Sequence, residues 1–197
     1  MAYPTVSSPY GLLPINLIGG RVFAGATRQI PIDSGSETAI FYGDIVELNS
    51  GGTLSKDTGT DAATPVGVFL GCAYTDATMG FLNRQYYPGN IVASDIVGYV
   101  CDDPDALFKV AVVSSGTTVG GVTRTAVGNN AVLVQNAGNT ITGNSKVAIN
   151  ATTDTTATFP IRIVDVVPET VNADGSYTEV IVKFNAGMQQ YDNATGV

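Results

Sequence analysis

Short runs rich in valine, isoleucine and threonine alternate with glycine, asparagine and aspartate along almost all of this 197-residue chain. Runs of this kind, bounded by turn residues, are typical of β-strands. The only segment with helical character spans 119–127, and Gly120 and Gly121 weaken it. We therefore expect an all-β fold, a small β-barrel or sandwich with an extended N-terminal arm and at most one short helix. The expected strands lie within 28–32, 38–48, 53–56, 65–74, 90–101, 107–113, 131–135, 146–149, 157–167 and 177–184.

Turn-forming residues indicate how these strands are connected. Asn49 to Gly52 and the pair Asp174-Gly175 each predict a hairpin. Pro31 confines its strand to the edge of a sheet, because proline has no backbone N–H to donate. Gly43-Asp44 predicts a bulge or bend within 38–48. The aromatic segment 75–89 has no strand pattern, so we expect an irregular insertion loop there.

The first twenty residues differ from the rest of the chain. Pro4, Pro9 and Pro14 exclude a helix and favour an extended backbone. We therefore divide the chain into an extended arm (1–20), a β-rich domain (21–187, with 114–130 as the place where two small subdomains would separate) and a C-terminal tail (188–197). The arm either packs along its own domain or lies on a neighbouring subunit. Its candidate oligomer or capsid contacts are Tyr3, Tyr10, Leu12, Leu13, Ile15, Leu17 and Ile18.

Histidine is absent, and charged residues make up only 13% of the chain. Histidine is the side chain best suited to proton transfer near neutral pH, and no nucleophile–base pair or phosphate-binding loop replaces it, so we predict no enzyme, no cofactor and no metal. The net charge is −8 and the nine lysines and arginines are scattered singly, which argues against direct nucleic-acid binding. Pro14 and Asn16 interrupt the N-terminal apolar stretch, so we expect neither a signal peptide nor a membrane span.

The two cysteines, Cys72 and Cys101, each lie in an apolar run that resembles a strand. Two alternatives remain open at this point. They are buried free thiols that act as small apolar residues, or they form a disulfide if their strands are neighbours.

Two further groups of residues have both a structural and a functional interpretation. The acids Asp102, Asp103 and Asp105 surround Pro104, as expected for a solvated turn, although a calcium site or a glycosidase acid pair would use the same side chains. Tyr86 and Tyr87 predict a small local core or an interface anchor, and the alternative is an aromatic platform for a sugar.

Several strings in the chain carry a family resemblance. They are YGLLPINLIGG (10–20), FYGD (41–44), TPVGVFLGCAYTD (64–76) and CDDPDALFKV (101–110), continued by TGNSKVA (142–148) and VIVKFN (180–185). Together these strings resemble virion structural proteins of tailed bacteriophages, and the resemblance covers nearly the whole chain. None of the strings is catalytic, and they are specific only in combination.

This resemblance implies a part of a virion. In size and β character the chain is similar to head decoration (cement) proteins, which implies a homotrimer on the capsid exterior, made in the host cytoplasm, with the major capsid protein as partner. Such a protein bridges neighbouring capsomers and stabilises the shell through several modest contacts. The alternative implied by the same resemblance is a tail, baseplate or host-adhesion protein.

Overall fold

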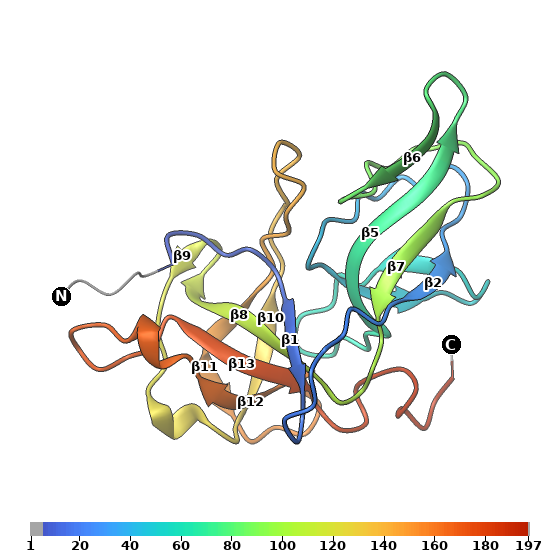
Figure 1. Ribbon diagram of the computed structural model, residues 1–197. Coiled ribbons are helices and arrows are strands. Elements are labelled where there is room, and N and C mark those ends of the chain that lie inside the picture. The colour runs from blue at the N-terminus through green and yellow to red at the C-terminus, as the bar shows by residue number, and fades with distance from the viewer. Residues whose placement is uncertain (1–5, 197) are drawn as a thin grey trace.

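The computed structural model describes residues 6–196 and confirms an all-β architecture (Figure 1). Thirteen strands form two sheets, and the only helical elements among these residues are two 3-10 turns, η1 (Arg124–Ala126) and η2 (Pro168–Thr170). In this part of the chain no helix is long and apolar enough to cross a bilayer. The helix expected within 119–127 is therefore reduced to the single turn η1, consistent with the glycines that precede it.

The first sheet closes into a five-stranded barrel. Its strands follow the order β8-β11-β10-β12-β13, and β13 pairs with β8 again to complete the circle. All of these pairings are antiparallel except that of β11 with β8. The short strands β1 and β9 attach to β8 outside the circle. The bounds are β1 (Leu13–Leu17), β8 (Ala106–Ser115), β9 (Thr118–Val119), β10 (Asn130–Val134), β11 (Ala148–Asp154), β12 (Ile161–Val166) and β13 (Glu179–Phe184).

The second sheet is open and contains the order β2-β7-β5-β3-β4, with β6 paired to the far end of β5. All of its pairings are antiparallel. The bounds are β2 (Arg28–Pro31), β3 (Ile45–Leu48), β4 (Leu54–Lys56), β5 (Gly67–Asp76), β6 (Gly80–Arg84) and β7 (Val97–Cys101). The chain passes from this sheet to the barrel between 101 and 106, so the predicted division near 114–130 is wrong. The segment 114–130 instead connects the barrel strands β8 and β10.

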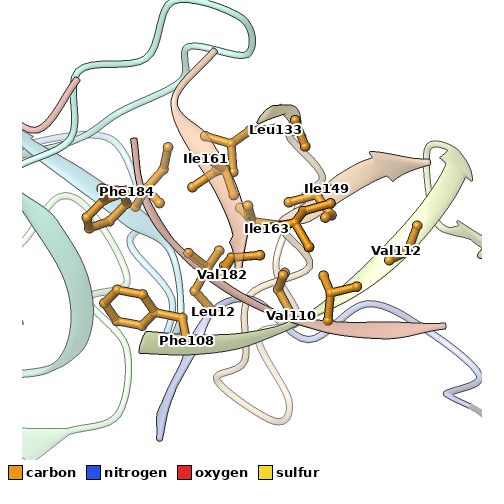
Figure 2. Packing of buried hydrophobic residues seen from close by; sticks show 14 of the residues in the cluster. Leu12, Phe108, Val110, Val112, Leu133, Ile149, Ile161, Ile163, Val182 and Phe184 are labelled. Atoms are coloured by element: carbon orange, nitrogen blue, oxygen red, sulfur yellow. The ribbon is translucent and has the colours of Figure 1, made fainter. Parts of the chain in front are cut away.

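Each sheet has its own apolar core. In the barrel, side chains from all five strands and from the N-terminal segment point toward one another, and Leu12, Phe108 and Val182 belong to this cluster (Figure 2). The core of the second sheet contains Phe69, Tyr74 and Tyr87. The burial of both sets explains why the strands that supply them read as nearly continuous apolar runs.

Several local predictions agree with the structure and one does not. Pro31 ends an edge strand, and Asn49 to Gly52 connect the hairpin β3–β4. Asp174-Gly175 lies in a tight turn on the connection between the paired strands β12 and β13. The irregular loop expected over 75–89 is wrong, because Gly80–Arg84 pair in register with Cys72–Asp76.

The N-terminal segment is part of the barrel and not a separate arm. Leu12 has no exposed surface, its N–H donates to the Gly43 carbonyl, and the Gly11 N–H donates to the Val147 carbonyl. β1 then pairs antiparallel with β8. Of the two alternatives for the arm, the structure shows packing along its own chain for the described residues. Tyr3 lies outside the described residues.

The C-terminal segment, expected as a tail over 188–197, is also docked. The buried Gln189 amide donates to the carbonyls of Val66 and Asp102 at 3.0 and 2.9 Å. The Gln190 side chain both accepts from the Leu48 N–H and donates to the Leu48 carbonyl, at 2.7 and 3.1 Å. These bonds connect the end of the barrel chain to the second sheet.

A buried ion pair of the second sheet is hydrogen-bonded to the barrel chain. The Lys56 Nζ lies 2.9 Å from Oδ2 of Asp44, whose side chain is fully buried. Ser145, in the segment leading to β11, donates its hydroxyl to the other carboxylate oxygen at 2.6 Å, and the Phe41 N–H donates to Oδ2 at 2.9 Å. The bend predicted at Gly43-Asp44 is present, with Gly43 at φ +89°.

Candidate interaction surface

Two of the predicted contact residues contribute to the protein's own cores. Leu12 and Tyr87 have no exposed surface, and the Tyr87 hydroxyl donates to the Ser36 carbonyl at 3.0 Å. Tyr86 is half-buried and stacks on Phe41, with ring centroids 5.2 Å apart. Tyr86 and Tyr87 therefore do not form the exposed aromatic platform that a sugar would need, and Leu12 and Tyr87 are corrected from surface to core residues.

The other predicted residues of the N-terminal segment vary in exposure. Leu13, Ile15 and Leu17 on β1 are half-buried, as is Tyr10, while Ile18 is 40% exposed. Of the predicted residues that the structure describes, Ile18 alone presents a largely free apolar side chain to a partner. Contact of this segment with another subunit stays a prediction.

Tyr10 fastens the N-terminal segment to the barrel. Its hydroxyl donates to the Glu179 carboxylate, which is nearly buried and also pairs with the Lys109 Nζ at 3.2 Å. The Lys109 ammonium lies 5.6 Å from the centroid of the Tyr10 ring. Burial first, and then the Glu179 carboxylate, raise the pKa of Tyr10 above its usual value, so the phenol remains a donor throughout the neutral range.

Replacing Tyr10 by phenylalanine is expected to lower the free energy of unfolding by about 1.5–3 kcal/mol, because the buried Glu179 carboxylate loses a hydrogen-bond donor. Urea denaturation measures the change. The matched control is Tyr191→Phe, whose hydroxyl donates to Asp102 at 3.2 Å at an exposed position, where a loss below about 1 kcal/mol is expected. Equal losses in the two variants would contradict this role for Tyr10.

The acids of the 102–105 turn have local partners. Asp102 pairs with Arg28 at 2.8 Å, and Asp105 pairs with Arg21 at 3.0 Å. Asp103 accepts the Asp105 N–H at 2.8 Å, as in a turn. Within residues 6–196 no three acidic, histidine or cysteine side chains converge as a metal site would require.

Cys72 and Cys101 are free thiols, one in each core, so the disulfide alternative is wrong. Burial raises the pKa of Cys72 to about 12 and that of Cys101 to about 11. Both groups are kept protonated and unreactive in the folded protein, because the thiolate is the nucleophilic form.

Because the pKa values of both thiols are raised, we expect the free energy of unfolding to fall at alkaline pH. A thiol of the unfolded chain loses its proton near pH 9, while the folded thiols keep theirs until about 11 or 12, so their contribution is complete below pH 9 and declines above it. Each thiol lowers the free energy of unfolding by up to about 1.4 kcal/mol per pH unit in this window. Urea titrations from pH 7 to 10.5 measure the slope. A matched Cys72→Ala variant should show a shallower decline, and an unchanged slope would contradict the assignment.

Four large apolar side chains that the sequence did not single out are exposed next to the second sheet. They lie on the β5–β6 hairpin, on the connection from β6 to β7 and on the connection from β10 to β11. These "apolar tips" are 61% to 94% exposed and are Met79, Phe81, Val92 and Ile141. Two sets of hydrogen bonds hold the three connections beside each other. The Gln85 amide donates to the Asn144 side chain at 2.6 Å, and Thr75 donates its N–H and hydroxyl to Asp95 at 3.0 and 2.6 Å.

The hairpin that carries Ile141 is internally ordered. The Asn139 side-chain oxygen accepts the N–H groups of Ile141 and Thr142, and the Gly143 N–H donates to the Asn139 carbonyl at 2.7 Å. In Figure 1 this amber hairpin and the green β5–β6 hairpin project in the same direction from the body of the molecule. An exposed isoleucine on an ordered turn is preorganised for contact with a partner.

A groove of about 550 Å³ lies at the base of the Ile141 hairpin, lined mainly by apolar atoms of Phe41, Ala39, Ala137 and Gly138. Two of its polar side chains have partners within the chain. Lys56 binds Asp44, and the Gln135 amide donates to the carbonyls of Asp57 and Gly59.

The basic side chains are mostly paired with acids or scattered along the chain. Five of the nine basic side chains form ion pairs, and the net charge is −8. The remaining bases, Arg84, Lys146, Arg162 and Lys183, come from different segments, so no basic stripe of the kind that tracks a phosphate backbone is built by one element.

The chain matches no known protein-family model, no curated protein and no solved structure.

Proposed function

We propose that this protein is a virion structural component that decorates the outside of a tailed-phage head and bridges neighbouring capsomers. The observation that carries the proposal is the set of apolar tips. Met79, Phe81, Val92 and Ile141 are exposed far beyond what folding requires, and hydrogen bonds hold their three connections together. Large apolar side chains exposed on neighbouring segments are candidates for an interaction site.

Two further properties support this proposal over other structural roles. The resemblance to phage virion proteins covers nearly the whole chain, and the acidic balance suits a position outside the shell better than one facing packaged DNA. In this role the partner is the major capsid protein, with a second contact between copies of the chain in a homotrimer. Each contact needs only modest affinity, because many copies on one shell act together.

Capsid binding by the tips is tested with assembled capsids that lack the protein. Co-sedimentation of the full chain with these capsids is expected, and Ile141→Asp should weaken it at least tenfold, because a carboxylate would have to be buried at the contact. The matched control is Val22→Asp, at an apolar residue that is 76% exposed but outside the tips, which should bind as the parent protein does.

A cryo-electron-microscopy map of the virion gives an independent test. Regular density for this chain over the outer face of the head supports the decoration role. Density confined to the tail or baseplate, or co-sedimentation that is absent or is unchanged by Ile141→Asp, would overturn it.

A further inference from the structure

The strand β6 has an open edge. It pairs with β5 on one side, and no strand among residues 6–196 lies along its other side (Figure 1). In an antiparallel strand the backbone N–H and C=O groups of successive residues point to alternate sides. Half of the β6 backbone groups therefore face outward, as a template on which another strand can pair.

Two other edge strands, β1 and β2, carry residues that oppose such pairing, and β6 does not. β1 contains Pro14, and β2 contains Pro31 and an exposed Arg28. Proline and charged side chains are the usual protection of a free strand edge. β6 has no proline, its one charge lies at its end, and its Phe81 is 70% exposed.

We propose that two copies of this chain pair through β6, antiparallel, around a two-fold axis at Leu82. In this register Leu82 lies opposite Leu82 of the second copy, Phe81 lies opposite Asn83, and Gly80 lies opposite Arg84. An antiparallel pairing of a strand with itself is self-complementary, as a closed two-fold contact requires. The contact does not depend on capsid binding. In a decorated shell it would join neighbouring trimers.

Charge complementarity supports this register. Arg84 forms no ion pair with any residue from 6 to 196. Asp76 lies directly opposite Gly80 across the hairpin. In the proposed register Gly80 lies opposite Arg84 of the second copy, so Asp76 and that arginine would project from the same face of the sheet. With strands about 4.8 Å apart, the two Cα atoms are about 10 Å apart, which an arginine and an aspartate side chain span together across a glycine that has no side chain.

The two-fold axis repeats this ion pair and brings the apolar residues together. The N–H groups of Met79 and Thr78 hold the pKa of Asp76 below its usual value, so the carboxylate is charged at neutral pH. The two Phe81 rings become diagonal neighbours on the other face, within reach of each other.

The area of one strand edge is well below the roughly 800 Å² per partner of a standard stable interface. A weak dimer is therefore expected in solution, and its strength in an assembly comes from repetition.

Engineered cysteines test the register in the full chain. The native thiols are buried, so Leu82→Cys introduces the one accessible thiol and should form a disulfide-linked dimer under mild oxidation. The matched control is Asn83→Cys, next on the same strand and more exposed, but placed opposite Phe81 of the second copy. We expect Leu82→Cys to cross-link at least tenfold faster than Asn83→Cys. Equal rates, or faster linkage of Asn83→Cys, would overturn the proposal.

If Leu82→Cys folds poorly, exchanging the charges of Asp76 and Arg84 provides a second test. Sedimentation velocity at high protein concentration should show a concentration-dependent dimer that Arg84→Asp weakens at least fivefold. The double change Asp76→Arg with Arg84→Asp should restore it. A single change without effect, or a double variant that stays as weak as the single one, would overturn the proposal. Capsid co-sedimentation of the same variants separates this contact from the decoration role, which Ile141→Asp tests.

Discussion

Replacing Asp44 by alanine is expected to lower the free energy of unfolding by about 3–5 kcal/mol, because the change leaves a buried lysine without its counter-charge. Asp44 is fully buried and the Lys56 side chain is only 10% exposed. The same carboxylate accepts the hydroxyl of Ser145, so its loss also frees a buried donor in the segment leading to β11. Urea denaturation followed by circular dichroism measures the change.

The exposed pair Arg124–Asp165 supplies the matched control. Its N–O distance is 3.2 Å, close to the 2.9 Å of the buried pair, but its side chains are 67% and 49% exposed. Asp165→Ala should therefore cost no more than about 1 kcal/mol. Adding Lys56→Met to Asp44→Ala should recover part of the loss, since the uncompensated charge is then removed. A loss of similar size in Asp44→Ala and Asp165→Ala would show that Asp44 does not carry the junction between the sheets.

Leu12→Ala is expected to cost about 2–5 kcal/mol, although the sequence places this residue in an arm. Leu12 has no exposed surface and lies among Phe108 and Val182 in the barrel core (Figure 2). The cost has two parts, the lost transfer of apolar atoms out of water and the cavity that remains. Thermal or urea unfolding measures it.

The control for this prediction is Ile18→Ala, six residues further along, which is 40% exposed and should change the free energy of unfolding by less than about 1 kcal/mol. For the same reason, deletion of residues 1–20 should unfold the barrel and not leave an intact core, because it removes Leu12 together with β1. A cooperatively folded deletion variant of near-parental stability would refute the assignment of Leu12 to the core.

Local chemistry explains why much of the fold is predictable. Pro31 lacks a donor wherever the strand lies, so its place on an edge follows from the residue alone. The turns at Asn49 to Gly52 and at Asp174-Gly175 depend on neighbours within four residues. The two cysteines lie in apolar runs, and apolar runs of this length are buried in either sheet.

The wrong predictions share a different cause. Gly80–Arg84 form a strand because β5 supplies a partner in register, and no apolar alternation within 75–89 reveals it. Tyr87 and Leu12 are core residues because distant segments cover them; Leu12, for example, is bonded to Gly43. The sequence does not identify the apolar tips, because the identity of an isoleucine or phenylalanine does not show whether its side chain is exposed.

The sequence by itself determined the class of structure, since turn residues and β-prone runs act over a few neighbouring residues, and it determined the acidic charge balance. Only the tertiary structure decided which runs share a sheet, where the chain changes from one sheet to the other, and which apolar side chains remain outside. These features depend on contacts such as that of Asp44 with Ser145, 101 residues apart, which no local pattern encodes. The candidate interaction surface is of this second kind, because exposure is a property of what the rest of the chain leaves uncovered.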